Sequence, residues 1–181
     1  MAGMSRRHFL ARGLVFGGGL CLLPLVRAET YLSVEQAQQL IYPGQALRAV
    51  DVELSAAQEK AIEKASKTRV RNPKLNAWRT EAGDWFIVDQ VIGKHENIDM
   101  AVGLSATGQV TGIEILVYRE TYGYEVRNEK WRAQFHGRDH TQLLKLDDPI
   151  RNISGATLSC RHITDGINRL TQTWNEVLRT L

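Results

Sequence analysis

Hydrophobic and polar positions alternate most clearly in the middle of the chain, in three short runs rich in β-branched and aromatic side chains. These runs are residues 85–92, 98–104 and 109–118. A period of two places successive side chains on opposite faces of a sheet, and the runs are separated by turn residues. The pattern therefore predicts three strands of an antiparallel sheet, with Ile113, Ile115 and Val117 facing the core.

A helical period replaces this alternation near the end of the chain. From about Ser159 to Leu181, apolar residues recur at spacings of three and four, which is the period of one face of an α-helix. The residues that set the period are Ile163, Ile167, Leu170, Trp174, Val177 and Leu181. We expect this amphipathic helix to pack across the sheet.

Two shorter helices are expected in the first half of the chain. Ser33 and Ser55 each stand at an expected N-cap with a glutamine three residues later, which is the spacing of a capping box. The second helix covers residues 56–66, which are rich in Ala, Glu and Lys. We interpret residues 29–80 as a helical N-terminal extension that precedes a domain over residues 81–181.

These elements together predict the fold class. Residues 130–135 form a short helical turn in this interpretation, and residues 147–149 form another turn. An antiparallel sheet covered by helices is an α+β fold. The C-terminal helix follows a loop of small residues, which is where the candidate chemistry lies.

Charge first suggests an anionic partner, because the chain carries a formal net charge of +3. Residues 1–28 contain four arginines and no acidic residue. Without these four, the 23 basic residues fall to 19 against 20 acidic ones, a net charge of −1. The positive charge therefore belongs to the N-terminal segment, and nucleic-acid binding loses its main support.

Residues 1–28 have the build of a secretory signal peptide that is cleaved after about Ala28. A basic start precedes an apolar run, residues 14–26, that is short for a membrane span and diluted by glycine. Ser5-Arg6-Arg7-His8-Phe9-Leu10 resembles the twin-arginine export signature, which implies a folded cargo and a periplasmic location. The alternative is an uncleaved anchor with a chance arginine pair.

A run of small residues and hydroxyls leads into the C-terminal helix. It reads Asn152-Ile153-Ser154-Gly155-Ala156-Thr157-Leu158-Ser159-Cys160. The free N–H groups and positive dipole end of a helix start can bind a phosphate, and Gly155 and Ala156 leave room for a ligand near the backbone. A loop that merely caps the helix explains the same residues equally well.

Part of this run, Ser154-Gly155-Ala156-Thr157-x-Ser159, resembles the flavinylation motif of the FMN-binding domain family. That family includes the FMN-carrying subunits of the Rnf complex and of the sodium-translocating NADH:quinone reductase. The similarity covers roughly residues 85–180. Its other parts are Gly93-Lys94-His95-Glu96, Val102-Gly103-Leu104, Gly112-Ile113-Glu114, Tyr118-Arg119-Glu120-Thr121-Tyr122-Gly123 and the segment 131–137.

The resemblance implies that a flavin transferase outside the cytoplasm joins FMN to Thr157 through a phosphoester, using FAD. It implies an exported electron-transfer flavoprotein, rather than a stand-alone reductase, that exchanges electrons with membrane-associated or periplasmic redox partner proteins. The cofactor-binding residues expected beside the covalent Thr157 are Ser154, Gly155, Ala156, Leu158, Ser159, Glu120, Thr121, Tyr122, Gly123, Tyr124 and Trp131.

Arg151 departs from the family pattern, because many members have an Asp three residues before the first Ser or Thr of the motif. This residue leaves open a second reading, an exported accessory or binding module without covalent flavin. A third reading is a reductase that acts on a small substrate. That activity would need a closed pocket and a proton donor, for which the sequence offers no convincing residue.

Two further pairs of residues could carry chemistry but do not fit it. Cys160 and His162 are two positions apart on the expected helix, so they cannot face each other as thiol and base. We expect Cys160 to be at least half-buried. His136 and His140 have the spacing of zinc ligands, but Gly137 interrupts the helix between them, so no metal site is expected.

Overall fold

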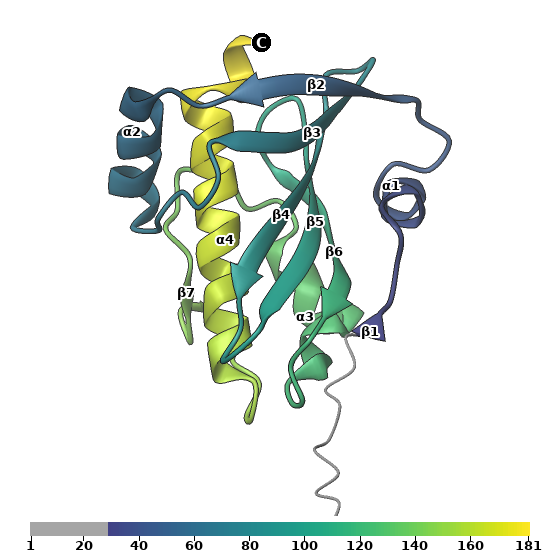
Figure 1. Ribbon diagram of the computed structural model, residues 1–181, viewed down its shortest axis with the longest axis vertical. Coiled ribbons are helices and arrows are strands. Elements are labelled where there is room, and N and C mark those ends of the chain that lie inside the picture. The colour runs from purple at the N-terminus through teal and green to yellow at the C-terminus, as the bar shows by residue number, and fades with distance from the viewer. Residues whose placement is uncertain (1–28) are drawn as a thin grey trace, which may run out of the picture.

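The computed structural model describes residues 29–181, so the predicted signal peptide lies outside the described residues (Figure 1). One antiparallel sheet, in the order β1-β6-β5-β4-β3-β2, forms its centre. The strands are β1 (Glu29–Thr30), β2 (Leu47–Glu53), β3 (Lys74–Thr80), β4 (Trp85–Ile92), β5 (Asn97–Leu104) and β6 (Val110–Tyr118). Strands β2 to β6 are neighbours both in sequence and in space, so most of the sheet is a meander.

Helices and short turns cover this sheet. The α-helices are α1 (Val34–Ile41), α2 (Ala56–Ser66), α3 (Glu129–Arg132) and α4 (Thr157–Glu176). The short elements are the 3-10 turns η1 (Tyr124–Arg127), η2 (Ala133–Phe135) and η3 (Leu178–Thr180), and a parallel pair of β7 (Lys145–Leu146) with β8 (Pro149–Ile150). The predicted α+β class is confirmed. Within residues 29–181, no helix combines the length and apolarity needed to cross a membrane.

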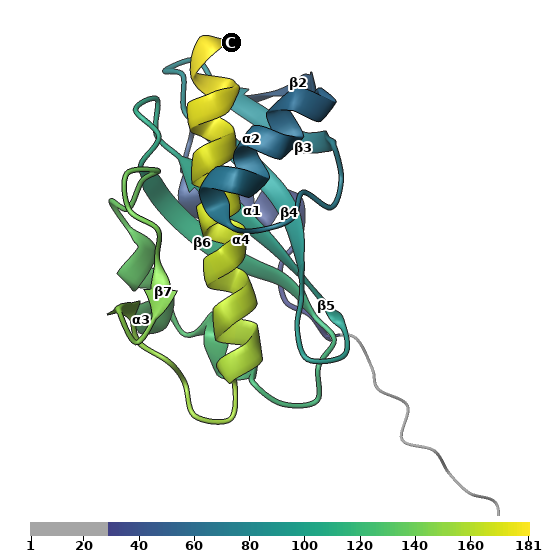
Figure 2. The same cartoon turned by 90° about the vertical axis from the view of Figure 1, so that its left-hand side faces the viewer.

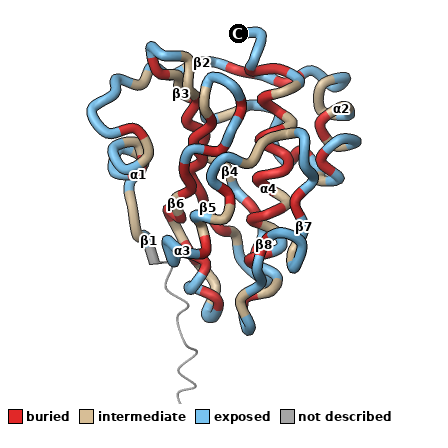
Figure 3. The backbone as a smooth tube through the Cα atoms, turned by 180° about the vertical axis from the view of Figure 1, so that it is seen from behind, coloured by how far each residue is buried: buried red, intermediate tan, exposed pale blue. Residues whose placement is uncertain are grey.

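Helix α4 lies across one face of the sheet with α2 beside it (Figures 1 and 2). Gly166 permits the close approach, because a Cβ there would lie 2.6 Å from Met100 Cε and 2.7 Å from Val91 Cγ1. Buried residues are concentrated in α4 and in the strands that it covers (Figure 3). The predicted apolar face is therefore confirmed as far as Trp174. The helix ends at Glu176 rather than at Leu181; Val177 beyond it is still buried, while Leu181 is 55% exposed.

Helix α1 packs on the opposite face of the sheet, over a gap left by two glycines. Gly103 and Gly112 are cross-strand partners in β5 and β6. If Gly103 had a Cβ, it would lie 2.5 Å from the side chain of Ile41, and a Cβ on Gly112 would lie 3.1 Å from the same side chain. Ile41 therefore occupies the space above both glycines. Tyr42 follows the helix and donates a hydrogen bond to the carbonyl of Leu104 at 3.0 Å, and burial raises the pKa of its hydroxyl.

Residues 29–80 contain both predicted helices, but they are more than a helical extension. Strands β2 and β3 also lie in this segment, and β3 pairs with β4 of the central sheet. The proposed boundary at residue 80 therefore falls inside one continuous sheet. The missing signal has a physical reason: β2 is an edge strand that buries only Val52, so its sequence has no clear alternation of buried and exposed positions.

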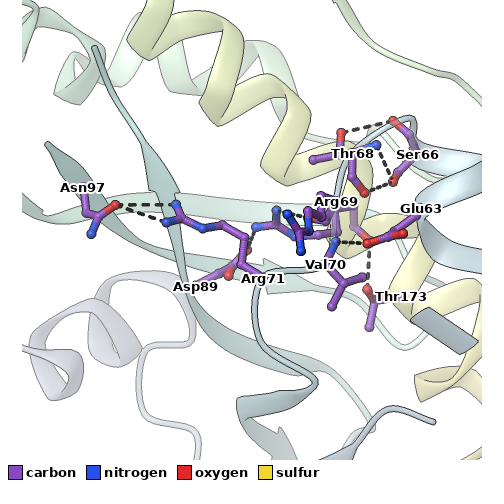
Figure 4. A network of polar contacts seen from close by, with 10 residues as sticks. Glu63, Ser66, Thr68, Arg69, Val70, Arg71, Asp89, Asn97 and Thr173 are labelled. Atoms are coloured by element: carbon purple, nitrogen blue, oxygen red, sulfur yellow. Dashed lines mark hydrogen bonds and ion pairs between the residues drawn. The ribbon is translucent and has the colours of Figure 1, made fainter. Parts of the chain in front are cut away.

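Polar contacts also hold this N-terminal part against α4 (Figure 4). Arg169 of α4 is 6% exposed; it forms an ion pair with Asp89 of β4 at 2.5 Å and donates to the carbonyl of Arg69 at 3.0 Å. Glu63 of α2 accepts a hydrogen bond from the backbone N–H of Val70 at 2.9 Å. Because a buried guanidinium is costly to leave unpaired, the loop after α2 is fixed to the same core as α4.

The alternation along β6 changes phase at Leu116. The pairing with β5 passes over this residue, which makes it a β-bulge. Ile113 and Ile115 face the core under α4, as predicted, but Val117 packs on the α1 side. Val117 thus packs against a core cluster, but the prediction that it shares a face with Ile113 and Ile115 is wrong, because one inserted residue reverses the alternation. The same reversal turns Tyr118, 2% exposed, into the core beneath α4.

Candidate functional site

Three segments that are distant in sequence meet at the start of α4 around a cavity of about 590 Å³. They are the turn between β4 and β5, the segment after β6, and the loop that enters α4. Their lining residues are Lys94, His95, Glu120, Thr121, Tyr122, Gly155, Ala156, Thr157, Leu158 and Ser159. The start of α4 lies at the lower end of the molecule in Figure 1. The volume lies within the usual range for small-molecule sites.

Helix α4 begins without a side-chain cap. Ala156 is the N-cap residue, and no side chain within residues 29–181 makes a cap hydrogen bond there. Gly155 has a φ of +86°, a left-handed conformation that favours glycine and turns the chain into the helix. The first backbone N–H groups of α4 and its positive dipole end therefore border the cavity, an arrangement that suits a phosphate.

Thr157 is the first residue of α4 and lines the cavity with a half-buried side chain. Asn152 donates a hydrogen bond from Nδ2 to Thr157 Oγ1 at 3.0 Å. A threonine hydroxyl has one hydrogen and two acceptor positions, so this bond leaves its hydrogen and one lone pair for other partners. Thr157 thus presents a potential nucleophile at the uncapped helix start.

Tyr118 connects the segment after β6 to α4. Its hydroxyl donates to the carbonyl of Tyr122 at 2.6 Å and shares a hydrogen bond with Ser159 Oγ at 3.0 Å, and burial raises its pKa to about 12. Gly123 has a φ of +92° and packs against both residues: a Cβ on Gly123 would lie 2.6 Å from Tyr118 Oη and 3.1 Å from the Cβ of Ala156. The predicted site did not include Tyr118. Its side chain points to this side of the sheet because of the β-bulge in β6.

Glu120 fixes the turn between β4 and β5 against the cavity. Its Oε1 accepts hydrogen bonds from the backbone N–H groups of His95 at 2.5 Å and Glu96 at 3.0 Å. Burial opposes ionisation of this carboxyl, but these hydrogen bonds hold its pKa below the usual value. At Gly93 a Cβ would lie 2.4 Å from the same oxygen. The turn and Glu120 therefore depend on each other for their positions.

His162 joins α4 to this turn from the other side. Its Nδ1 lies 2.6 Å from the carbonyl oxygen of Ile92 and 3.1 Å from that of Gly93, so Nδ1 carries the hydrogen and donates. The hydrogen bonds of His162 therefore go to the turn.

Cys160 is fully buried, and burial raises the pKa of its thiol. The expectation that Cys160 is at least half-buried is confirmed.

Trp131 lies behind the loop that enters α4 and does not line the cavity. Its Nε1 donates to the carbonyl of Arg151 at 2.7 Å, and its ring packs edge-on against Phe135. The side chain of Gln134 accepts from the backbone N–H of Arg151 at 2.8 Å. The structure thus places Trp131 as a support for the loop, on a second cavity of about 600 Å³ that Asn152 also lines.

The other predicted residues divide into wall and margin. All of them except Ser154, Gly123, Tyr124 and Trp131 line the cavity. Ser154 is exposed at the loop, and Tyr124 is 53% exposed with its ring 5.8 Å from the Arg127 guanidinium. Lys94 and His95 line the wall but are missing from the prediction. Their signal was present in the sequence, in the Gly93-Lys94-His95-Glu96 part of the resemblance.

No group of three His, Cys, Asp or Glu side chains among residues 29–181 is placed to hold a metal ion. His140 packs against the ring of Trp174 at 5.9 Å, while His136 is exposed. The structure therefore gives these two histidines different surroundings rather than a common site.

The α+β fold has a cavity of the size that small molecules occupy, and a family comparison supports FMN as the ligand. Residues 93–172 match the family model described as the FMN-binding domain. This match supports an FMN-binding domain in the chain and indicates a flavin-binding protein. The matched stretch contains every residue that lines the cavity. No curated protein matches the chain.

The cavity residues fit the parts of FMN. The uncapped first turn of α4 suits the phosphate. Tyr122 and Leu158, 80% and 37% exposed, offer apolar surface for a planar ring, and Lys94 brings a positive charge to the opposite wall. When bound, FMN supplies the redox chemistry, while the protein supplies its placement and electrostatic surroundings.

Proposed function

We propose that the protein is an exported electron carrier that holds FMN in this cavity through a phosphoester to Thr157. The observation that carries the proposal is the position of Thr157. It stands at the uncapped start of α4 and lines a cavity whose residues all lie within the stretch that matches the FMN-binding domain. The resemblance of Ser154-Gly155-Ala156-Thr157 to the flavinylation motif supports the bond. A covalent ester also prevents loss of the flavin outside the cytoplasm.

The attachment transfers a group without any redox change. Thr157 Oγ1 forms a bond to the phosphorus of the FMN half of FAD, and the pyrophosphate bond to the AMP half breaks. AMP leaves, and the hydroxyl proton passes to a base of the flavin transferase. The backbone N–H groups at the start of α4 then stabilise the charge of the phosphodiester that remains.

Exposed aromatic side chains around the cavity support electron exchange with protein partners. Tyr122 and Tyr124 are 80% and 53% exposed, and Leu158 adds apolar surface at 37% exposure. Exposed tyrosines are common at protein interfaces, because the ring is apolar and the hydroxyl is polar. A flavin beside these residues would be accessible to a donor and then to an acceptor, as an electron carrier requires.

Arg151 favours a second function, that of an accessory module without covalent flavin. Its backbone is held by Trp131 and Gln134, and the residue is exposed. The substitution therefore changes the charge that a transferase meets without changing the support of the loop. If the transferase requires the aspartate that many family members have at this position, the wild-type protein stays unmodified and Arg151→Asp gains the flavin.

Intact mass tests the covalent bond directly. The full chain, produced with its leader in a host that has the transferase, is expected to gain the mass of one FMN less one water. Thr157→Ala removes this gain. Thr107→Ala, which removes an exposed hydroxyl from the turn between β5 and β6, outside the cavity, leaves it unchanged. Retention of the gain in Thr157→Ala would place the flavin elsewhere, and a colourless, unmodified wild type would support the accessory module.

Export is tested separately from flavin attachment. Cleavage after Ala28 predicts a mature protein that begins at Glu29. Replacement of Arg6 and Arg7 by lysine is expected to leave the unprocessed chain in the cytoplasm, because the twin-arginine signature is read by a receptor. Normal processing of this double variant would contradict export by that route.

A further inference from the structure

We propose that Asn152 positions the Thr157 hydroxyl for the transfer of FMN, an inference that rests on the proposed attachment at Thr157. The direct observation is the 3.0 Å hydrogen bond from Asn152 Nδ2 to Thr157 Oγ1. The two residues stand on either side of the turn at Gly155. Asn152 lies outside the motif that resembles the flavinylation sequence, so that motif gives it no role.

The loop presents Asn152 from a fixed position. The residue before it, Arg151, is held at both backbone groups: its N–H donates to Gln134 at 2.8 Å and its carbonyl accepts from Trp131 at 2.7 Å. Trp131 is 6% exposed and packs against the fully buried Phe135. The backbone next to Asn152 is therefore anchored to the hydrophobic core, and the exposed side chain of Asn152 extends from it to Thr157.

The far side of the turn is fixed as well. The N–H of Ala156 donates to the carbonyl of Ile153 at 3.0 Å, which closes the loop immediately before Thr157. Ala156 itself is 3% exposed and packs close to Gly123. The backbone is thus held on both sides of the turn without the Asn152–Thr157 bond, so this bond is available to orient the hydroxyl.

The bond leaves the hydroxyl ready to react toward the cavity. Asn152 donates to one lone pair of Oγ1, which leaves the other lone pair to form the bond to phosphorus and the hydrogen to pass to the base. The P–O bond to the AMP half of FAD breaks in the same step. Asn152 makes and breaks no bond itself; it is a positioning residue that restricts where the nucleophile points.

A kinetic experiment with the full chain, a flavin transferase and FAD tests this role. The rate of mass gain is measured over a range of acceptor-chain concentrations, which separates kcat from KM. Asn152→Ala is expected to lower kcat about tenfold, the equivalent of about 1.36 kcal/mol, and to leave KM unchanged. Asn152→Asp, which keeps the size but removes the donor, is expected to be as slow.

The matched control is Asn175→Ala, near the opposite end of α4, where Asn175 donates to Glu176 at 3.1 Å in an exposed pair. It is expected to transfer at the wild-type rate. An unchanged kcat in both Asn152 variants, or a raised KM with unchanged kcat, would overturn the positioning role. An unmodified wild type, or a modified Thr157→Ala, would instead overturn the proposed attachment, and the inference with it.

Discussion

The starts of α1 and α2 contrast with the start of α4. Ser33 and Ser55 each form a complete capping box, in which the serine accepts from the N–H of Gln36 or Gln58 and the glutamine accepts from the N–H of the serine. The N–H···O distances are 3.2 and 2.8 Å in α1, and 3.3 and 2.8 Å in α2. At α4, Ala156 supplies no such acceptor.

The difference separates stability from function. A side-chain cap contributes about 1 kcal/mol, which matters for short helices such as α1 and α2. Helix α4 is long and largely buried, so packing against the sheet stabilises it without a cap. Its free N–H groups border the cavity instead. The capped starts therefore support the fold, while the uncapped start is available to a ligand.

The largest effect is expected from Gly123→Ala, which disturbs the packing of Gly123 against Ala156, the N-cap residue of α4. The new Cβ would lie 2.6 Å from Tyr118 Oη at a φ of +92°, so both a clash and backbone strain result. We expect a loss of about 3 kcal/mol in the free energy of unfolding, together with weaker FMN binding. Denaturant unfolding and flavin fluorescence titration measure the two effects.

Gly137→Ala is the matched control, because Gly137 has a φ of +73° but no atom within 4 Å of the Cβ position among the described residues. It carries the backbone strain without the clash, so it is expected to cost about 1 kcal/mol and to leave FMN binding intact. Equal losses in the two variants would show that close packing at Gly123 is unimportant.

The next effect comes from removing the caps of α1 and α2 together. Ser33→Ala and Ser55→Ala are each expected to lower the free energy of unfolding by about 1 kcal/mol, and the two losses should add because the helices are on different faces of the sheet. FMN attachment should be unchanged. A parallel loss of attachment would contradict the separation of capped and uncapped starts.

Glu120→Gln tests the charged acceptor on the cavity wall. Because the folded-state pKa of Glu120 is lowered, its charge stabilises the fold above the unfolded-state pKa, and this contribution is lost as the pH falls through the folded-state value. Since the side chain is partly exposed, we expect a loss of about 1 kcal/mol at neutral pH. The stabilities of wild type and variant should converge as the pH falls below the lowered folded-state pKa of Glu120. A pH-independent difference would assign the effect to packing.

The smallest effect is expected for Ser154→Ala. This serine precedes α4 but makes no side-chain hydrogen bond to residues 29–181, unlike Ser33 and Ser55. The change should alter the stability of the flavin-free protein by less than about 0.5 kcal/mol. A loss near 1 kcal/mol, comparable with that of Ser55→Ala, would show that α4 is capped after all.

The strongest local patterns predicted the fold well. The capping boxes of Ser33 and Ser55, the strands at residues 85–92 and 98–104, and the apolar face of α4 are all present. Strands β2 and β3 could not be predicted, because each buries only one apolar residue, Val52 or Ala77, and so has little periodic signal. The bulge at Leu116 was also beyond reach, since register depends on the neighbouring strand.

The site shows the same division. The run from Gly155 to Ser159 and the residues Glu120–Tyr122 do line one cavity, which the resemblance implied. The place of Trp131 behind the loop depends on the tertiary path of α3 and η2, which no local pattern specifies. The bond from Asn152 to Thr157 was equally hidden, because it depends on the turn at Gly155.

The order of elements along the chain has a consequence for synthesis. The β3–β4, β4–β5 and β5–β6 hairpins each close a short loop, so the sheet can begin to pair while the ribosome is still elongating the chain. Its apolar face stays uncovered until α4 emerges, and the cavity cannot close before then. A transport system that accepts only folded cargo, such as the proposed one, must therefore wait for the last helix, and a chain truncated before α4 would be retained inside the cell.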